Sequence, residues 1–193
     1  MACLLKMSAE NSAKIYLRTA DNKMIADELR SCNVSFLHDK PDSAFNEGMF
    51  QSGALAEKIK RRNPKIKDYF VESQQVKINP ADTAALSAAA QDRANYYQEH
   101  THDENEAWYI HHGQTAFYLH LQNYVYAIIC TAGDFICIPG QTRHWFDAGA
   151  APSFSGLRFY LTLNAPVTTG DKIALRYPQL ECLSSLITLG SAL

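Results

Sequence analysis

Between residues 107 and 163 the chain is a succession of short apolar stretches, rich in aromatic and β-branched residues and separated by turn-forming residues. Such residues favour extended chain, and the stretches have the length of strands. The expected strands are 108–110, 117–121, 124–130, 135–138 and 154–163, with turns at Gly113, Gln122-Asn123, Gly133 and Pro139-Gly140. This spacing predicts an antiparallel sandwich or barrel built from hairpins.

The part of the chain before this region is more polar and favours helices. The residues expected to be helical are 21–31, 45–62 and 81–92. Pro64 ends the second of these patterns, and Asp82 provides a start signal for the third. The composition changes without a linker, so we expect one domain over residues 1–193. It would comprise a helical N-terminal part at about 1–95, a β core at about 96–165 and a C-terminal tail at about 180–193.

Composition excludes several classes of function. Eighteen Lys and Arg against 20 Asp and Glu give a formal charge of −2, which argues against nucleic acid as a partner. The longest strongly apolar run, 125–130, is far shorter than the roughly 20 residues of a membrane-spanning helix. The first residues lack the features of a secretory signal, and the five cysteines form no CxxC pair. We therefore expect a cytoplasmic protein with no membrane partner.

The run HTHDENE and a distant histidine have the spacing of a metal site. His100 and His102 are two residues apart, so in an extended strand both imidazoles point to one face. Glu106 can return a carboxylate to that face after a short turn. His144 follows the expected strand 135–138 and its turn, and would come from another strand. The pattern predicts a site of three histidines and one carboxylate.

Imidazole and carboxylate ligands suit a divalent ion such as Fe(II), Ni(II), Mn(II) or Zn(II). Four protein ligands on an octahedral ion leave two adjacent positions open, which a bidentate small molecule could fill.

The other histidines carry weaker signals: adjacent His111 and His112 face opposite sides of a strand, and His38 and His120 are expected to be structural. The basic segment 58–67 is expected to place cations near the end of a helix, where the helix dipole favours them.

The segments HTHDENEAWYIHHG and GDFICIPGQTRHWFD resemble the two motifs of the cupin superfamily and, within it, the acireductone dioxygenase family. The resemblance covers about residues 13–180. It implies an α+β, mainly β fold: a cupin antiparallel β-barrel, or double-stranded β-helix, with N-terminal helices packed outside. It also implies Fe(II) or Ni(II) held by His100, His102, Glu106 and His144, with Arg158 holding an anionic substrate. The family reaction is cleavage of 1,2-dihydroxy-3-keto-5-methylthiopentene by O₂ in methionine salvage.

The chain departs from the family pattern around the expected substrate pocket, as a divergent member would. Trp108 stands where the family normally has arginine, and His111 replaces a glutamate. Residues 161–166 replace an Asn-Pro-Glu-Gly-Trp segment. We expect Trp108 and Phe146, which alternates in phase with His144, to shape the pocket.

Two alternative functions follow from these departures. One is a cupin enzyme acting on another chelating diol, diketone or sugar-like substrate. The other is a non-catalytic module that binds a ligand through the metal. The protein would be a monomer or a homodimer.

Overall fold

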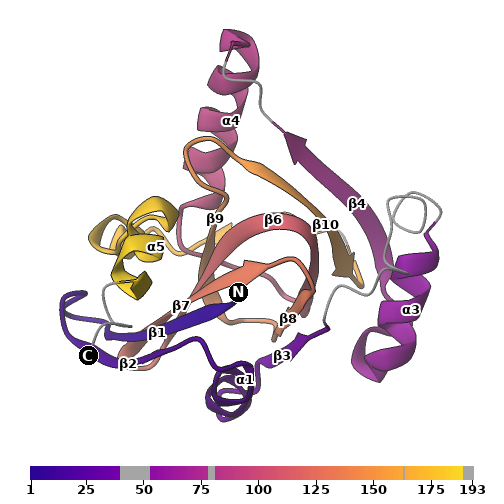
Figure 1. The fold of residues 1–193 in the computed structure, drawn as a ribbon, viewed down its shortest axis with the longest axis horizontal. Helices are drawn as coiled ribbons and strands as arrows, with labels where there is room; N and C mark the ends of the chain where they lie inside the picture. The colour runs from indigo at the N-terminus through magenta and orange to yellow at the C-terminus, as the bar shows by residue number, and fades with distance from the viewer. Residues whose placement is uncertain (40–52, 78–80, 163, 189–193) are drawn as a thin grey trace.

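A computed structural model describes residues 1–39, 53–77, 81–162 and 164–188 of the chain (Figure 1). The strands are β1 (Cys3–Ser8), β2 (Ile15–Thr19), β3 (Ser35–His38), β4 (Phe70–Lys77), β5 (His100–Thr101), β6 (Glu106–Leu121), β7 (Tyr124–Thr131), β8 (Asp134–Ile138), β9 (Arg143–Asp147), β10 (Ser153–Tyr160) and β11 (Val167–Thr168). The helices are α1 (Asn22–Arg30), α3 (Ala54–Arg62), α4 (Thr83–Tyr96) and α5 (Leu180–Thr188), with short 3₁₀ helices η1 (Pro64–Ile66) and η2 (Ile173–Arg176).

The long strand β6 belongs to both parts of the antiparallel sheet. Its first part pairs with β8 and β10, and its second part pairs with β7 and β9. The change of partners occurs near Gly113, which has a φ of +77° and where a side chain would meet the backbone of Ser153 and Phe154. The expected turn at Gly113 is therefore wrong: glycine lets one continuous strand bend there while another backbone approaches closely.

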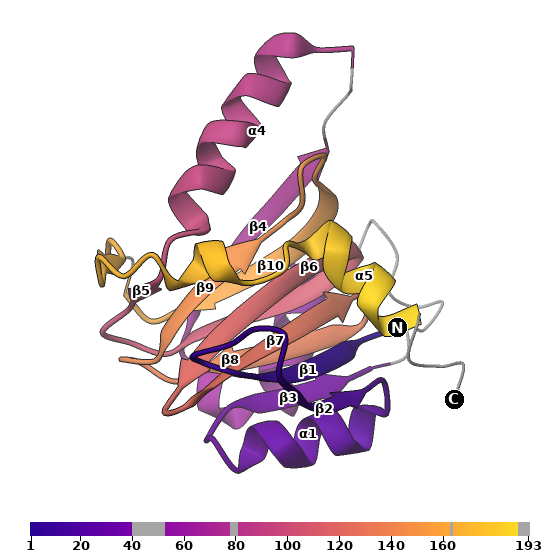
Figure 2. The ribbon, with the colours of Figure 1, turned by 90° about the vertical axis from the view of Figure 1, so that its left-hand side faces the viewer.

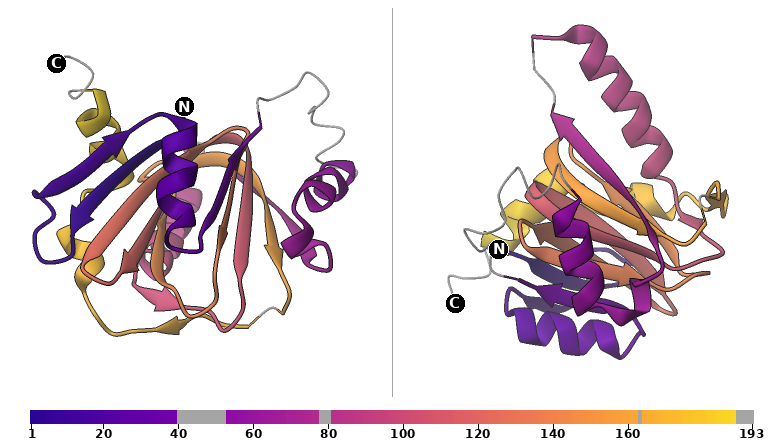
Figure 3. Two further views of the ribbon diagram at one scale, coloured as in Figure 1. Left: turned by 90° about the horizontal axis from the view of Figure 1, so that it is seen from below. Right: turned by 90° about the vertical axis from the view of Figure 1, so that its right-hand side faces the viewer.

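The sheet is extended by strands from the N-terminal part of the chain. β1 pairs with β7 and β2, β3 pairs with β8, and β4 pairs with β10. The expectation of a helical region at about 1–95 is thus only partly correct, because β1, β3 and β4 pair with strands that come later in the sequence. Figure 3 shows the strands curving around an interior. Trp108, Phe117, Ile136 and other apolar side chains form one buried cluster. The expected mainly β, α+β fold is confirmed.

The helices lie outside the strands and largely follow the predicted ranges. Asp21 caps α1 by accepting a hydrogen bond from the Met24 backbone N–H at 2.8 Å, and Ile25 and Leu29 are buried. Helix α3 ends in Lys60, Arg61 and Arg62, so the predicted cations lie in its last turn; the earlier part of the predicted helix, 45–52, lies outside the described residues.

The last two helices go beyond what the sequence patterns indicated. Asp82 caps α4, which continues to Tyr96, beyond the expected end at residue 92. Figure 2 shows α4 extending away from the strands. The expected tail at 180–193 begins as α5, and residues 189–193 lie outside the described part.

No described helix is both long and apolar enough to cross a membrane. Cys130 and Cys137 are buried free thiols, as expected of core residues.

Candidate metal centre

Three strands and one short loop position the four predicted ligands. β5 carries His100, β9 carries His144, and these two residues are paired in register. Glu106 is the first residue of β6. His102 lies just after β5, and its carbonyl accepts a hydrogen bond from the Gln141 N–H at 2.7 Å. Residues far apart in the sequence are thus brought to one end of the sheet by strand pairing.

The three imidazoles face one another. The ring centroids are 4.4 Å apart for His100 and His144, 5.2 Å for His100 and His102, and 5.3 Å for His102 and His144. Each histidine offers one nitrogen, and these nitrogens all lie within 4.8 Å of one another. An ion bound at about 2.1 Å places neighbouring ligand atoms roughly 3 Å apart, so only small shifts are needed to close the group around it.

Backbone carbonyls fix the orientation of two of these rings. The His100 Nδ1–H donates to the Gln98 carbonyl at 2.7 Å, and the His144 Nδ1–H donates to the Thr142 carbonyl at 2.8 Å. The other nitrogen, Nε2, therefore carries the lone pair. Nε2 of His144 is buried without a hydrogen-bond partner. A buried acceptor without a partner is costly, and a bound cation would satisfy it.

The Glu106 carboxylate lies between this group and an arginine. Its Oε2 is 3.4 Å from Nε2 of His144 and 3.8 Å from Nε2 of His102. Its Oε1 accepts from Nε of Arg158 at 2.7 Å and is also 2.7 Å from Nη2. Arg158 thus holds one oxygen and turns the other toward the histidines. This contact was not foreseen from the sequence, which indicated only a role for Arg158 toward substrate.

Burial and local charge favour the protonation states that a metal requires. Burial, with the neighbouring His144, lowers the pKa of His100 to about 4, and burial also lowers the pKa of His102. Burial would raise the pKa of Glu106, but His144 and Arg158 outweigh this effect and hold it well below its usual range. At neutral pH His100 and His102 are therefore neutral and Glu106 is ionised, which suits the binding of a divalent cation.

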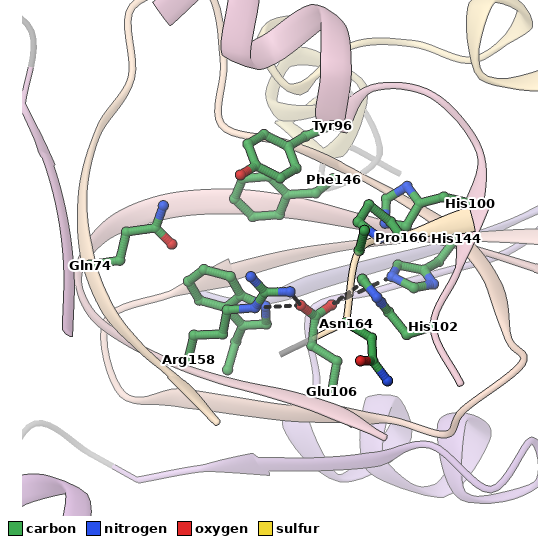
Figure 4. A pocket seen from close by; sticks show the side chains of 12 residues that line it. Gln74, Tyr96, His100, His102, Glu106, His144, Phe146, Arg158, Asn164 and Pro166 are labelled. Atoms are coloured by element: carbon green, nitrogen blue, oxygen red, sulfur yellow. Dashed lines mark hydrogen bonds and ion pairs between the residues drawn. The ribbon is translucent and has the colours of Figure 1, made fainter. Parts of the chain in front are cut away.

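The histidines open into a cavity of about 340 Å³, within the usual range for a small-molecule site (Figure 4). Trp108 and Phe146 form an apolar wall, with rings 5.8 Å apart and nearly parallel at 12°. The Arg158 guanidinium carbon lies 5.8 Å from the centroid of the Trp108 ring. Both aromatic residues expected to shape the pocket do line it, together with the metal group and Arg158.

Further lining residues were missed by the sequence analysis: Gln74, Tyr96, Asn164, Ala165 and Pro166. Tyr96 could have been found only if α4 had been predicted to its true end. Gln74 comes from β4, a strand that the sequence did not indicate. Asn164, Ala165 and Pro166 belong to the segment that replaces the family's Asn-Pro-Glu-Gly-Trp stretch. That replacement was the sequence feature from which their place in the pocket lining could have been predicted.

The remaining histidines lie outside the cavity lining. His38 Nδ1 is 2.7 Å from Asp134, and His120 Nδ1 is 2.6 Å from the buried Glu99. His112 is exposed and His111 is partly exposed. None of them joins the group formed by the three histidines.

Comparison with known proteins points to one family. The family model described as ARD/ARD′ matches residues 12–166. Acireductone dioxygenase 1 of Nocardia farcinica is 32% identical over 189 residues, covering 94% of this chain and 98% of the relative. The acireductone dioxygenase of Gluconacetobacter diazotrophicus is 35% identical over 183 residues, covering 85% and 91%.

A solved structure shares the fold. It is an acireductone dioxygenase from Bacillus anthracis, described with a cadmium ion in its active centre. The TM-score is 0.67 at 16% identity, and the match covers 86% of this chain and 99% of that one.

Proposed function

Because this chain belongs to the ARD/ARD′ family, we propose that it is a metal-dependent dioxygenase that cleaves the acireductone 1,2-dihydroxy-3-keto-5-methylthiopentene with O₂ in methionine salvage. The family resemblance expected from the sequence is thereby confirmed. The observation that supports the activity most directly is the convergence of three imidazoles and a carboxylate at one end of a small-molecule cavity. The enzyme would act in the cytoplasm as a monomer or homodimer.

In this proposal His100, His102, Glu106 and His144 hold one Fe(II) or Ni(II) ion. The bound ion would supply Lewis acidity and two adjacent positions for the ene-diol oxygens. The family chemistry predicts formate and a 2-keto acid with iron, and carbon monoxide, formate and methylthiopropionate with nickel. His100 and His102, whose pKa values are lowered, and ionised Glu106 can bind the ion without releasing protons at neutral pH.

The other residues of the cavity bind and orient the substrate. Arg158 keeps Glu106 in place, and its guanidinium also faces the cavity, where it can neutralise an ene-diolate. The stacked Trp108 and Phe146 exclude water from one side of the bound substrate, which strengthens electrostatic contacts made there. Fixing a chelated, electron-rich substrate in one orientation is the main contribution that these side chains make to the rate.

A second candidate is a dioxygenase of this family acting on a less charged ene-diol. Among the described lining residues Arg158 is the one with a cationic side chain, and it is already paired with Glu106. Trp108 supplies an aromatic surface where a second cation would stand in the family pattern. Such a wall suits a flatter or less charged molecule.

The test is O₂ uptake with product analysis. The protein is loaded separately with Fe(II) and Ni(II), its metal content is measured, and enzymatically generated acireductone is added. Uptake above the spontaneous oxidation of the substrate, lost in His144→Ala, is expected. No uptake by protein with bound metal would refute the proposed reaction, and turnover of a neutral ene-diol ketone alone would favour the second candidate.

A further inference from the structure

A second cavity adjoins the metal cavity beneath helix α4. Its volume is about 310 Å³, and it lies between α4 and the strands β4, β9 and β10. The two cavities share three lining residues: Gln74, Tyr96 and Phe146. In the view of Figure 4, Tyr96 and Phe146 lie between Gln74 and the histidines. The second cavity, here called the α4 groove, therefore continues from the metal site past the ring of Phe146.

Small side chains keep the α4 groove open. Helix α4 presents Ala85, Ala88 and Ala89 to it, at the spacing of one helix face. The structure describes every residue of α4, and none of them is fully buried. A helix that packs directly on a sheet normally buries a stripe of large apolar residues. Here α4 instead spans a space, and Figure 2 shows it leaning away from the strands.

The opposite wall of the α4 groove is mainly apolar, with Gln74 and Gln75 of β4 as its polar members. It includes Val76, Ala148, Pro152 and Phe154, and the Phe154 ring lies 6.0 Å from the ring of Phe146. The wall is therefore continuous with the aromatic side of the metal cavity. From Tyr96 at the metal end to Ala85 the groove follows about 16 Å of helix, at 1.5 Å per residue.

The charges near the α4 groove disfavour an anionic occupant. The Arg93 guanidinium is held by Asp147 at 2.8 Å and by Glu181 at 3.0 Å. Asp92 adds an exposed carboxylate at the edge. An uncharged apolar chain fits these walls best.

We propose that the α4 groove binds the tail of the substrate, and that the enzyme takes ene-diol ketones with an unbranched apolar tail longer than methylthioethyl. This inference rests on the proposed function, because the metal site must hold the ene-diol headgroup. With the headgroup at the histidines, the tail passes Phe146 and Tyr96 and runs along Ala89 toward Ala85. Each buried methylene is worth up to about a fourfold gain in affinity.

The first experiment measures binding without turnover. The protein is loaded with Zn²⁺, which is redox-inert, and titrated calorimetrically with butano-, octano- and decanohydroxamic acids, whose headgroup chelates through two oxygens. Affinity is expected to rise with each lengthening of the tail, by ten-fold or more from butano- to octanohydroxamic acid. Equal affinities for all three tails would overturn the inference.

Variants of α4 locate the tail. Ala89→Leu narrows the groove near the metal end and is expected to abolish most of the gain for octanohydroxamic acid while sparing the butano compound. Ala85→Leu, farther along, is expected to weaken only the decano compound. The matched control Ala94→Leu adds the same side chain on the exposed face of the same helix and should behave as the unmodified protein. A full gain in Ala89→Leu would overturn the inference.

The second experiment separates the inference from the proposed function. O₂ uptake is measured with the metal-loaded enzyme on ene-diol ketones carrying methylthioethyl, hexyl and nonyl tails. A rise in kcat/KM with tail length supports the inference. Uptake that is independent of tail length overturns the inference and leaves the proposed function standing, whereas no uptake with any substrate by protein with bound metal refutes both.

Discussion

A methyl group added at Gly140 is expected to weaken the metal site as well as the fold. The turn after β8 lies directly on the loop that carries His102: the Gly140 N–H donates to Asn105 Oδ1 at 2.9 Å, and the Gln141 N–H donates to the His102 carbonyl at 2.7 Å. A Cβ at Gly140 would overlap the Asp103 carbonyl oxygen and lie 3.0 Å from its carbon. Both obstacles are backbone atoms, so no side-chain rotation relieves them.

The size of the effect follows from this contact. An ordinary contact needs about 3.5 Å, so the turn and the loop must separate by roughly 1 Å in Gly140→Ala. Metal–ligand distances vary by only about 0.2 Å, so a shift of this size in the loop that carries His102 weakens its bond to the metal. We expect zinc affinity to fall ten- to hundredfold, about 1.4–2.8 kcal/mol, while the free energy of unfolding of the metal-free protein falls by about 1–3 kcal/mol.

The assay is competition for Zn²⁺ against a chromogenic chelator at pH 7.5, with urea unfolding of the metal-free protein alongside. Gln141→Ala is the control, because it removes only the exposed side-chain bond to Asp103 and keeps the backbone contacts. This variant should bind zinc as the unmodified protein does. A folded Gly140→Ala protein with unchanged zinc affinity would refute the idea that this turn holds the ligand loop.

Three further predictions concern single residues of the site. Metal content measured after zinc loading should fall sharply in His144→Ala, because β9 would no longer supply a ligand; full occupancy would contradict this role. Burial lowers the pKa of His100 in the folded protein to about 4, whereas the unfolded chain protonates it near pH 6.5. When the pH falls from 7.5 to 5, the free energy of unfolding of the metal-free protein should therefore drop by about 2 kcal/mol more than that of His100→Asn, as measured by urea unfolding. Equal pH dependence of the two proteins would be inconsistent with this assignment. Trp108→Arg should lower the free energy of unfolding by about 3 kcal/mol, because Trp108 is 6% exposed and stacked on Phe146; an unchanged urea midpoint would argue against the stack.

The strands of the second half of the chain could be predicted because each has a local signal. β7 and β8 combine β-branched and aromatic residues with a glycine or Gln-Asn turn beside them. β1 and β4 lack such signals for opposite reasons. β1 is buried on nearly every residue between β2 and β7, so it does not alternate, and β4 is a polar strand that pairs only with β10 among the described strands. Their pairing depends on partners that a local pattern does not contain.

In the candidate site, too, the features with a local sequence signal could be predicted and those that depend on distant partners could not. The spacing of His100, His102 and Glu106 is local, so the ligand pattern could be read directly from the sequence. The contact of Arg158 with Glu106 depends on the register of β10 against β6, in which Arg158 is opposite Trp108. The end of α4 at Tyr96 depends on packing around Phe146, where the two rings lie 6.4 Å apart. Long-range register and packing therefore decide the substrate side of the cavity.

The pairing of β5 with β9 has a consequence for the order of events during synthesis. A nascent chain that has emerged as far as the turn at Gly140 already contains His100, His102 and Glu106, but neither His144 nor Arg158. Without β9 the ligand strand opposite His100 is missing, and without β10 the Arg158 contact that orients Glu106 is missing. Tight metal binding is therefore expected only after β10 has left the ribosome, when the strands that carry His144 and Arg158 are both available.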